Sequence, residues 1–224
     1  MNEYLRVEPA KGYAFPVAKA GIPLIGAAAF ITAVFALLSL SLPALLAMAA
    51  AMFICYFFRD PDRLVPNISD AVVSPADGKV IKIEKLERSR FYEGPSLKIS
   101  VFMSIFNVHV NRIPFTGKVT KISYFPGKFF SANLDKASSD NEHNAVFLET
   151  EAGQRICFVQ IAGLVARRII CNIHENESVQ RGQRFGLICF GSRLDVYLPP
   201  TFEVQVGLGD RVCAGTSLLG KLAS

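Results

Sequence analysis

The chain has 224 residues, a length that allows one or two domains. Its apolar content of 51% and mean hydropathy of +0.33 are high for a water-soluble protein. The net charge of +5 is modest and no basic run is interleaved with aromatic residues, so a nucleic-acid partner is not expected.

The first predicted element is a long apolar run. Residues 20–58 include no charged side chain, while Lys19 and Arg59 bracket the run. A Ser-Leu-Ser step and a proline divide it into two segments, Ile22–Leu40 and Pro43–Phe58. Each segment lies at or just below the roughly 17–25 residues with which a helix crosses a bilayer. The run therefore predicts a hairpin of two apolar helices.

A membrane-embedded hairpin is the favoured interpretation, and a buried helical hairpin in a soluble core is the alternative. A signal peptide fits poorly, because the apolar region is too long and no small-residue cleavage site follows it. Two short spans joined by a tight turn leave both ends on one side of the membrane. Lys11, Lys19, Arg59 and Arg63 predict that this side is cytoplasmic, according to the positive-inside rule.

The cysteines and histidines argue for a reducing compartment and against a metal site. The five cysteines are odd in number and none belongs to a C-x-x-C pair, as expected of reduced thiols rather than a disulfide framework. The three histidines lie far apart in the sequence, and no Cys/His cluster has zinc-ligand spacing. We therefore expect no metal ion.

From Ala71 onward the sequence predicts short β-strands punctuated by glycine and proline. Alternating or apolar runs predict strands over 72–73, 79–83, 97–103, 145–149, 156–161 and 202–206. The polar stretch Phe130–Asn144, which is rich in Ser, Asp and Asn, predicts a long loop.

One segment of this β region is repeated. Pro75–Ile83 recurs as Pro114–Ile122, and glycine-turn-strand patterns also occur over Glu177–Gly186 and Val206–Gly215. This pattern of glycine turns and short strands resembles the barrel-sandwich hybrid of lipoyl and biotinyl domains. The expected fold class is mainly β (α+β): a barrel-sandwich-hybrid-like β domain preceded by an N-terminal apolar helical hairpin. A carrier function fits less well, because neither repeat places its lysine at a hairpin tip.

Near the C-terminus, Gly191-Ser192 separates two apolar strand-like runs, Leu187–Phe190 and Leu194–Leu198. One interpretation is a Gly-Ser turn in a β-hairpin. The other is a bend in which a strained backbone exposes the carbonyl of Gly191 to the hydroxyl of Ser192. In that case the serine can attack its own chain.

Two further residues carry potential chemistry. Asp77 belongs to the turn Ser-Pro-Ala-Asp-Gly, and His109 follows an apolar strand. An Asp, a His and a Ser can form a relay in which the imidazole deprotonates the hydroxyl and the carboxylate orients the imidazole. The alternative is structural, with Asp77 capping its own turn and His109 satisfied in the core.

Taken together, these motifs resemble those of phosphatidylserine decarboxylases of the short, membrane-associated bacterial type. The matching stretches occur in order and span most of the chain: Phe57–Arg63, Val73–Gly78, Phe102–Pro114, Asp140–Asn144, Gln160–Ile169 and Arg184–Arg193.

The resemblance implies a cofactor that the chain makes from itself. Ser192 would attack the carbonyl of Gly191, and the resulting ester would break by β-elimination to leave an N-terminal pyruvoyl group. Residues 1–63 would form the N-terminal segment with the membrane hairpin at about 20–58, and residues 64–224 the catalytic domain. Cleavage would give a β chain of residues 1–191 and an α chain of residues 192–224, which remain associated.

The implied activity is decarboxylation of phosphatidylserine to phosphatidylethanolamine and carbon dioxide, through a Schiff base with the pyruvoyl ketone. Ser192, His109 and Asp77 would be the catalytic residues. The partner would be an anionic phospholipid in a membrane. The protein would then be at the cell membrane, with its catalytic domain on the cytoplasmic side.

The sequence departs from the family pattern in two places. Longer members carry a second histidine where this chain has Arg112, so either His109 alone or another group serves as the base for self-cleavage. The family's Asn-Glu-Arg motif ends here in His143. Candidates for contact with the lipid phosphate are His143, Arg167, Arg168 and Arg193.

Three other functions compete with this one. A non-enzymatic, membrane-anchored carrier or adaptor predicts an intact chain and a modifiable lysine. A membrane serine hydrolase fits less well, because the sequence has no G-x-S-x-G elbow. A pyruvoyl decarboxylase that acts on a free amino acid fits less well, because its substrate would not require a membrane hairpin.

Overall fold

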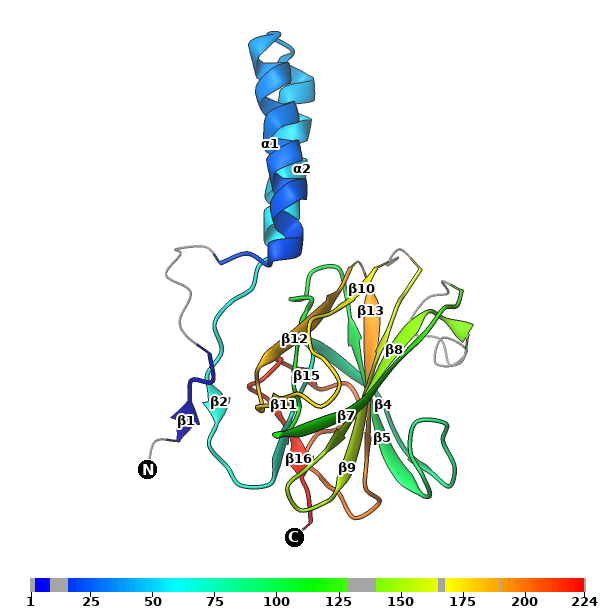
Figure 1. Cartoon of the computed structure of the whole chain (residues 1–224). Helices are drawn as coiled ribbons and strands as arrows, with labels where there is room; N and C mark the ends of the chain where they lie inside the picture. The colour runs from blue at the N-terminus through cyan, green and yellow to red at the C-terminus, as the bar shows by residue number, and fades with distance from the viewer. Residues whose placement is uncertain (1–2, 9–15, 129–139, 165–167, 190, 224) are drawn as a thin grey trace. The chain divides into compact units, whose positions relative to one another are not determined.

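The computed structural model describes residues 3–8, 16–128, 140–164, 168–189 and 191–223 (Figure 1). The chain divides into two compact units. One unit comprises residues 10–62, and the other combines residues 1–9 with residues 63–224.

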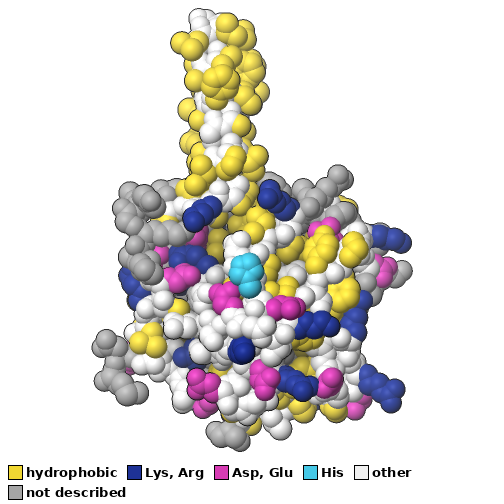
Figure 2. All heavy atoms as spheres, in the orientation of Figure 1, with side chains coloured by type: hydrophobic (Ala, Val, Ile, Leu, Met, Phe, Trp, Pro, Cys, Tyr) yellow, Lys and Arg dark blue, Asp and Glu magenta, His cyan; other side chains and the backbone are white. Residues whose placement is uncertain are grey.

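The first unit is a pair of apolar helices. A short 3-10 turn, η1 (Lys19–Gly21), leads into α1 (Ile22–Leu37), and α2 (Ser41–Phe57) follows after a turn in which Ser39 has a φ of 57°. No residue of α1 is buried, and Phe57 is the one buried residue of α2. Hydrophobic side chains cover the visible face of the pair in Figure 2. The helical hairpin predicted from the sequence is therefore present.

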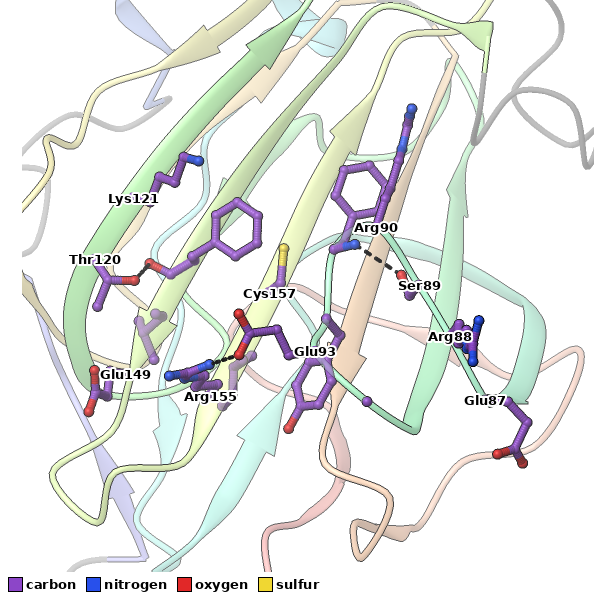
Figure 3. Close-up of a pocket in the computed structure, with 16 residues that line it drawn as sticks. Glu87, Arg88, Ser89, Arg90, Glu93, Thr120, Lys121, Glu149, Arg155 and Cys157 are labelled. Atoms are coloured by element: carbon purple, nitrogen blue, oxygen red, sulfur yellow. Dashed lines mark hydrogen bonds and ion pairs between the residues drawn. The ribbon is translucent and has the colours of Figure 1, made fainter.

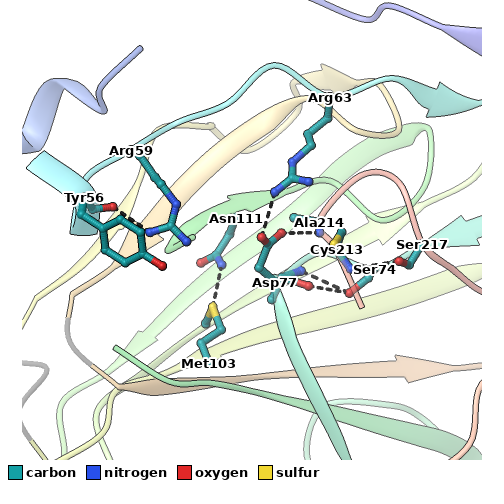
Figure 4. A network of polar contacts seen from close by, with 11 residues as sticks. Tyr56, Arg59, Arg63, Ser74, Asp77, Met103, Asn111, Cys213, Ala214 and Ser217 are labelled. Atoms are coloured by element: carbon teal, nitrogen blue, oxygen red, sulfur yellow. Dashed lines mark hydrogen bonds and ion pairs between the residues drawn. The ribbon is translucent and has the colours of Figure 1, made fainter. Parts of the chain in front are cut away.

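The base of the hairpin is closed by specific contacts. The backbone N–H of Ala18 donates to the carbonyl of Phe58 at 2.8 Å. A Cβ atom on Gly21 would lie 2.4 Å from Cγ of Phe58, so only glycine allows the two ends to approach this closely. At the end of α2, Arg59 donates to the carbonyl of Tyr56 at 2.7 Å and lies over its ring (Figure 4). A cation at this position also complements the helix dipole.

The second unit is built of β-strands joined by turns. In chain order its strands are β1 (Tyr4–Leu5), β2 (Val65–Pro66), β3 (Ala71–Val73), β4 (Gly78–Leu86), β5 (Ser96–Met103), β6 (Val110–Arg112), β7 (Gly117–Phe125), β8 (His143–Glu149), β9 (Arg155–Ile161), β10 (Ile169–Cys171), β11 (Ser178–Val179), β12 (Arg184–Ile188), β13 (Ser192–Leu198), β14 (Glu203–Val204), β15 (Arg211–Val212) and β16 (Leu218–Lys221).

An antiparallel sheet of eight strands dominates this unit, in the order β11-β7-β8-β9-β13-β5-β4-β15. Figure 1 shows the sheet curling into half of a barrel. Two three-stranded sheets, β10-β12-β6 and β14-β16-β3, complete the unit together with the β1-β2 pair. The prediction of a mainly β fold with an N-terminal helix pair is confirmed.

The two faces of the main sheet carry separate cores. Because side chains alternate along a strand, Leu194, Val196 and Leu198 of β13 join the larger hydrophobic cluster, whereas Tyr197 joins a smaller one. The smaller cluster lies around Phe91, which is in the connection between β4 and β5. β13 is thus buried on both faces along its whole length.

Most of the predicted strands are present. β3, β4, β5, β8 and β9 contain the strands expected over 72–73, 79–83, 97–103, 145–149 and 156–161. The strand expected over 202–206 is reduced to Glu203–Val204. Most of the expected loop lies outside the described residues, and its last two residues, His143 and Asn144, belong to β8 instead. Their pairing with β9 explains why polar residues extend the strand here.

The sequence repeat corresponds to a structural repeat. Gly78 begins β4 and Gly117 begins β7, and both strands are nine residues long. The register of β4 against β5 shifts between Val80 and Lys82. The register of β7 against β8 shifts between Val119 and Lys121, which are the equivalent positions of the repeat. The two strands therefore share a bulge, which bends a strand and increases its twist. This bending supports the curvature of the sheet.

Both repeat glycines should be indispensable for stability. A Cβ atom on Gly78 would lie 2.1 Å from the carbonyl oxygen of Phe102, and one on Gly117 would lie 2.4 Å from that of Glu149. We expect either alanine substitution to lower the free energy of unfolding in urea by about 1–3 kcal/mol. Gly207→Ala is the control, because its nearest neighbour is 3.7 Å away. Equal costs at all three positions would contradict the close-approach explanation.

Candidate active site

A groove of about 750 Å³ lies beside the connection between β4 and β5, with strands β7, β8 and β9 on its other side (Figure 3). An ion pair between Arg155 and Glu93 lies in it. None of Asp77, His109 and Ser192 lines this groove. Because β9 begins at Arg155 and its other end pairs with the start of β13, the groove lies at the opposite end of the sheet from Ser192.

The chain crosses from one sheet to another at the Gly-Ser pair. β12 ends at Ile188 in a small sheet, and β13 begins at Ser192 in the main sheet, so the hairpin-turn interpretation is wrong. Phe190 lies outside the described residues. Gly191 has a φ of 64°, and a Cβ atom there would meet no atom within 4 Å. The left-handed backbone, rather than lack of space, is what favours glycine at this position.

Ser192 is fully buried at the start of β13, where it pairs with Met103 of β5. Its side chain lies on the same face of the strand as Leu194, and so points toward the larger core. The Oγ atom lies 4.0 Å from the sulfur of Met103, which is a weak acceptor. The hydroxyl is therefore in the interior of the half-barrel, shielded from bulk water.

Asp77 directly precedes β4, and only 7% of its surface is exposed. Its Oδ2 accepts a hydrogen bond from Nη2 of Arg63 at 2.8 Å, and its Oδ1 accepts one from the backbone N–H of Ala214 at 2.7 Å (Figure 4). Three segments distant in sequence thus meet at one carboxylate. These contacts orient the buried charge and offset its loss of hydration.

His109 is fully buried and directly precedes β6. The pairing of β6 with β12 sets Val110 opposite Leu187, and the carbonyl of His109 accepts a hydrogen bond from the N–H of Ile188 at 3.4 Å. His109 therefore lies beside the end of β12, on the segment that leads to Ser192.

The topology brings the backbones of the three relay candidates to one region. β4 and β13 flank β5 and run antiparallel to it, so Asp77 and Ser192 both lie at the end of β5 that contains Met103. Asn111 of β6, two residues beyond His109, donates through Nδ2 to the sulfur of Met103 at 3.6 Å. The end of β5 is thus the common neighbour of all three segments.

Arg112, which stands in place of a second histidine, has a different environment. Its Nη1 donates to the carbonyl of Gly182 at 2.8 Å and lies 3.8 Å from Glu8, which is also paired with Arg184. A guanidinium cannot accept a proton, so Arg112 cannot replace an imidazole as a base. Its contacts join β6 to the turn before β12 and to the start of the chain.

His143 is 2% exposed, and both of its ring nitrogens have partners inside the protein. Nε2 lies 2.8 Å from Nη2 of Arg90, and Nδ1 lies 2.5 Å from the carbonyl of Asn141. Because arginine only donates, Nδ1 carries the hydrogen in this arrangement. The ring stacks on Phe125 with centroids 4.7 Å apart. Burial, with a smaller effect from Arg90, lowers the pKa of His143 and favours its neutral form.

The arginine candidates for phosphate contact differ in exposure. Arg193 is 1% exposed, and its guanidinium forms two short contacts with Asp195, at 2.9 and 3.2 Å. Arg168 is exposed, and its carbonyl accepts a hydrogen bond from the N–H of Cys189 at 3.2 Å. Arg167 lies outside the described residues. Of Arg168 and Arg193, only Arg168 has an exposed side chain.

Sequence reasoning missed two groups at this site. Arg63 stands in the stretch that follows the helical hairpin, but nothing in that stretch indicates Asp77 as its partner. Asn111 and Gln160 are buried amides that hydrogen-bond to each other at 2.9 Å. A signal was available for Gln160, which interrupts the apolar run of β9. Asn111 stands between Val110 and Arg112 and offered no such signal.

The described cysteines are all free thiols. Cys157 is buried, and burial raises the pKa of its thiol well above the usual value. Within the described ranges, no group of three His, Cys, Asp or Glu side chains has an arrangement able to hold a metal ion.

Comparison with known proteins identifies the family. Residues 50–220 match the family profile described as phosphatidylserine decarboxylase. A protein named phosphatidylserine decarboxylase proenzyme from Desulfotalea psychrophila is 50% identical over 92% of this chain and 97% of its own length. A protein of the same name from Syntrophus aciditrophicus is 51% identical over 91% of this chain and 96% of its own length. A protein of the same name from Nitrosomonas eutropha is 44% identical over 92% of this chain and 94% of its own length.

The half-barrel with a serine buried at a sheet crossing therefore belongs to a class of decarboxylase proenzymes. The chain is a member of the phosphatidylserine decarboxylase family, as its motifs predicted. Membership in an enzyme family argues against the carrier and adaptor interpretation.

The contact between Arg63 and Asp77 should contribute strongly to stability. Arg63→Met leaves a buried carboxylate with only the N–H of Ala214, so we expect the free energy of unfolding to fall by about 2–4 kcal/mol. Arg155→Met is the matched control, because this arginine is 65% exposed and its partner Glu93 is 87% exposed. Its loss should cost less than about 1 kcal/mol in the same urea titration. Similar costs for both variants would mean that Asp77 does not depend on Arg63.

Proposed function

We propose that the chain is a proenzyme that cleaves itself between Gly191 and Ser192 and then converts phosphatidylserine to phosphatidylethanolamine and carbon dioxide. One observation carries the proposal: in a chain of this family, a buried serine directly follows a left-handed glycine at the crossing between two sheets. Such a serine has a fixed position relative to the preceding carbonyl, and its hydroxyl is shielded from bulk water.

Cleavage begins when Oγ of Ser192 gives up its proton and bonds to the carbonyl carbon of Gly191. The peptide C–N bond then breaks, its nitrogen takes up a proton, and an ester links the two residues. In the β-elimination that follows, residue 192 loses its Cα proton, a Cα=Cβ double bond forms, and Gly191 departs as a carboxylate. Hydrolysis then releases ammonia and leaves an N-terminal pyruvoyl group on residues 192–224.

His109 is the proposed base that accepts the proton of Ser192, because an imidazole exchanges protons near neutral pH. Asp77 is the proposed source of the negative charge that stabilises the protonated imidazole. Its contact with Arg63 supports this role by fixing the orientation of the carboxylate. Arg112 has no part as a base in this scheme.

A pyruvoyl ketone supplies an electron sink for the electron pair that remains when the headgroup carboxylate leaves as carbon dioxide. The surroundings of Ser192 fit a small uncharged carbonyl group, because its side chain lies against Met103 and near the amide of Asn111. Arg168, exposed near the segment that leads to Ser192, is the proposed contact for the lipid phosphate. Arg167 remains a proposal from its sequence position alone.

The strand pairing supports continued association of the two products. β13 would belong to the α chain, and its neighbours on both sides, β9 and β5, would belong to the β chain. β15 and β16 would likewise remain paired with β4 and β3 of the β chain. Cutting one peptide bond before Ser192 removes none of these ladders.

The helical hairpin supports a membrane location. In the described part of the chain, one helical stretch, Lys19–Leu37, is long and apolar enough to span a membrane, and Ser41–Phe57 is shorter. The exposed large side chains of both helices would otherwise face water. We place the hairpin in the cell membrane with its charged ends, and the catalytic domain, on the cytoplasmic side. This location brings the enzyme to an anionic lipid substrate.

Ser192→Ala should remain a single chain with no decarboxylase activity, because alanine has no atom that can form the ester. Ser192→Cys should cleave slowly, since a thiol can form the corresponding thioester. Mass spectrometry of the denatured proteins measures both outcomes. Ser100→Ala is the control, because Ser100 is also fully buried in the main sheet, and this variant should cleave like the parent chain. Two fragments from Ser192→Ala would place the break elsewhere.

A charge at the tip of the hairpin should weaken membrane binding. Leu37→Asp introduces a carboxylate at a side chain that is 85% exposed at the end of α1. A charge deep in a bilayer costs about 2.5–3.5 kcal/mol, so binding to phosphatidylserine vesicles should fall on the order of a hundredfold. Turnover of a short-chain, water-soluble substrate should be unchanged. Leu208→Asp, 68% exposed on the β unit, is the control for added charge. Unchanged sedimentation of Leu37→Asp with vesicles would contradict membrane insertion.

A further inference from the structure

Three buried side-chain amides form a chain that ends near Ser192. Nδ2 of Asn144 donates to Oε1 of Gln160 at 3.1 Å, and Nε2 of Gln160 donates to Oδ1 of Asn111 at 2.9 Å. Nδ2 of Asn111 then donates to the sulfur of Met103 at 3.6 Å (Figure 4). Oγ of Ser192 contacts the same sulfur at 4.0 Å. The three amides come from β8, β9 and β6 and are at most 3% exposed.

The hydrogen bonds give this chain a direction. An amide offers an acceptor on one side and donors on the other, so the orientation of each group fixes that of the next. Because Gln160 presents its NH₂ group to Oδ1 of Asn111, the NH₂ group of Asn111 turns toward the sulfur of Met103, which Oγ of Ser192 also contacts. Gln160 is itself held by Asn144 and by a longer contact to the carbonyl of Ile170, at 3.4 Å.

Space for this arrangement is provided by Gly186 of β12. A Cβ atom there would lie 2.2 Å from the carbonyl oxygen of Ile170 and 3.0 Å from Nε2 of Gln160. A larger residue would therefore separate β12 from β10 and displace the amide. The strands that lead to Ser192 are thus packed directly against the amide chain.

The acceptor at the end of the chain is unusually poor. Burying an amide N–H against a thioether leaves most of its hydrogen-bonding capacity unused, which costs free energy in a dry interior. A donor in this situation gains most when a stronger acceptor forms nearby. Negative charge forms nearby when Ser192 loses its proton and adds to the carbonyl of Gly191.

We propose that the side-chain amide of Asn111 donates the hydrogen bond that stabilises negative charge at Ser192 and Gly191 during ester formation, and that Gln160 and Asn144 are positioning residues that keep this N–H group directed there. This proposal rests on the proposed self-cleavage. The covalent step is the one described above, and Asn111 neither gains nor loses a proton in it. A donor of this kind is effective because it is aligned before the charge develops.

The direct test replaces Asn111 by leucine, which has a similar size and no donor. We expect cleavage of the freshly folded precursor to slow about a hundredfold, as for loss of one donor to an oxyanion. Hydroxylamine cleaves an ester but not a peptide bond. If the donor acts in ester formation, Asn111→Leu accumulates no ester, and hydroxylamine does not release the two fragments. Near-ultraviolet circular dichroism and thermal unfolding establish that the precursor is folded.

Gln160→Met tests the direction of the amide chain without changing Asn111, the residue that carries the proposed donor. It should slow cleavage about three- to tenfold, because Asn111 loses the contact that orients it. In an Asn111→Leu background the same change should have no further effect on the cleavage rate, because both act through one donor. Gln154→Met is the matched control, since this half-buried glutamine bonds instead to the carbonyl of Ala223, and it should cleave like the parent.

Three results would overturn the assignment: normal cleavage of a folded Asn111→Leu precursor, release of its fragments by hydroxylamine, or additive effects of the Asn111 and Gln160 changes on the rate. These outcomes differ from failure of the proposed function. If the parent chain does not break between Gly191 and Ser192, the self-cleavage itself is wrong. If the parent breaks there and Asn111→Leu does so equally fast, only the role of Asn111 is wrong.

Discussion

Hydrogen bonding on both edges of β13 is the constraint on which the rest of the structure depends. The strand pairs with β5 from Ser192 to Leu198 and with β9 from Arg193 to Tyr197. This pairing places the serine at the interior end of a rigid ladder and fixes the face to which its side chain points. It would also keep both products of the proposed cleavage in one sheet, because the ladders on either side of the strand do not depend on the peptide bond before Ser192.

The fold uses this rigidity to keep polar groups in a dry interior. A carboxylate at Asp77 and amides at Asn111 and Gln160 are costly to bury unless each has a hydrogen-bond partner. Arg63 and the N–H of Ala214 provide the partners for the carboxylate, and the amides satisfy one another. The weakest acceptor in this network is the Met103 sulfur beside Ser192. The proposed self-cleavage would create a stronger, negatively charged acceptor near it.

Local patterns in the sequence predicted much of the fold. The uncharged run predicted the helix pair, alternation predicted β4 and β5, and the recurrence of Pro75–Ile83 corresponds to two strands with the same bulge. Contacts between distant segments could not be predicted, since neither Arg63 with Asp77 nor the amide chain leaves a periodic signal. The Gly-Ser hairpin turn, one of two alternatives, was wrong because flanking strands indicate a turn whether or not they pair with each other. The roles of His109 and Arg168 remain predictions.

All of the proposed chemistry requires that the chain convert Ser192 into a pyruvoyl group by breaking its own backbone. Mass spectrometry of the purified parent protein under denaturing conditions tests it most directly. We expect two fragments, residues 1–191 with a free carboxylate and residues 192–224 with a mass lower by one ammonia than a serine-initiated peptide. A single intact chain, or a smaller fragment that begins with unmodified serine, would contradict it.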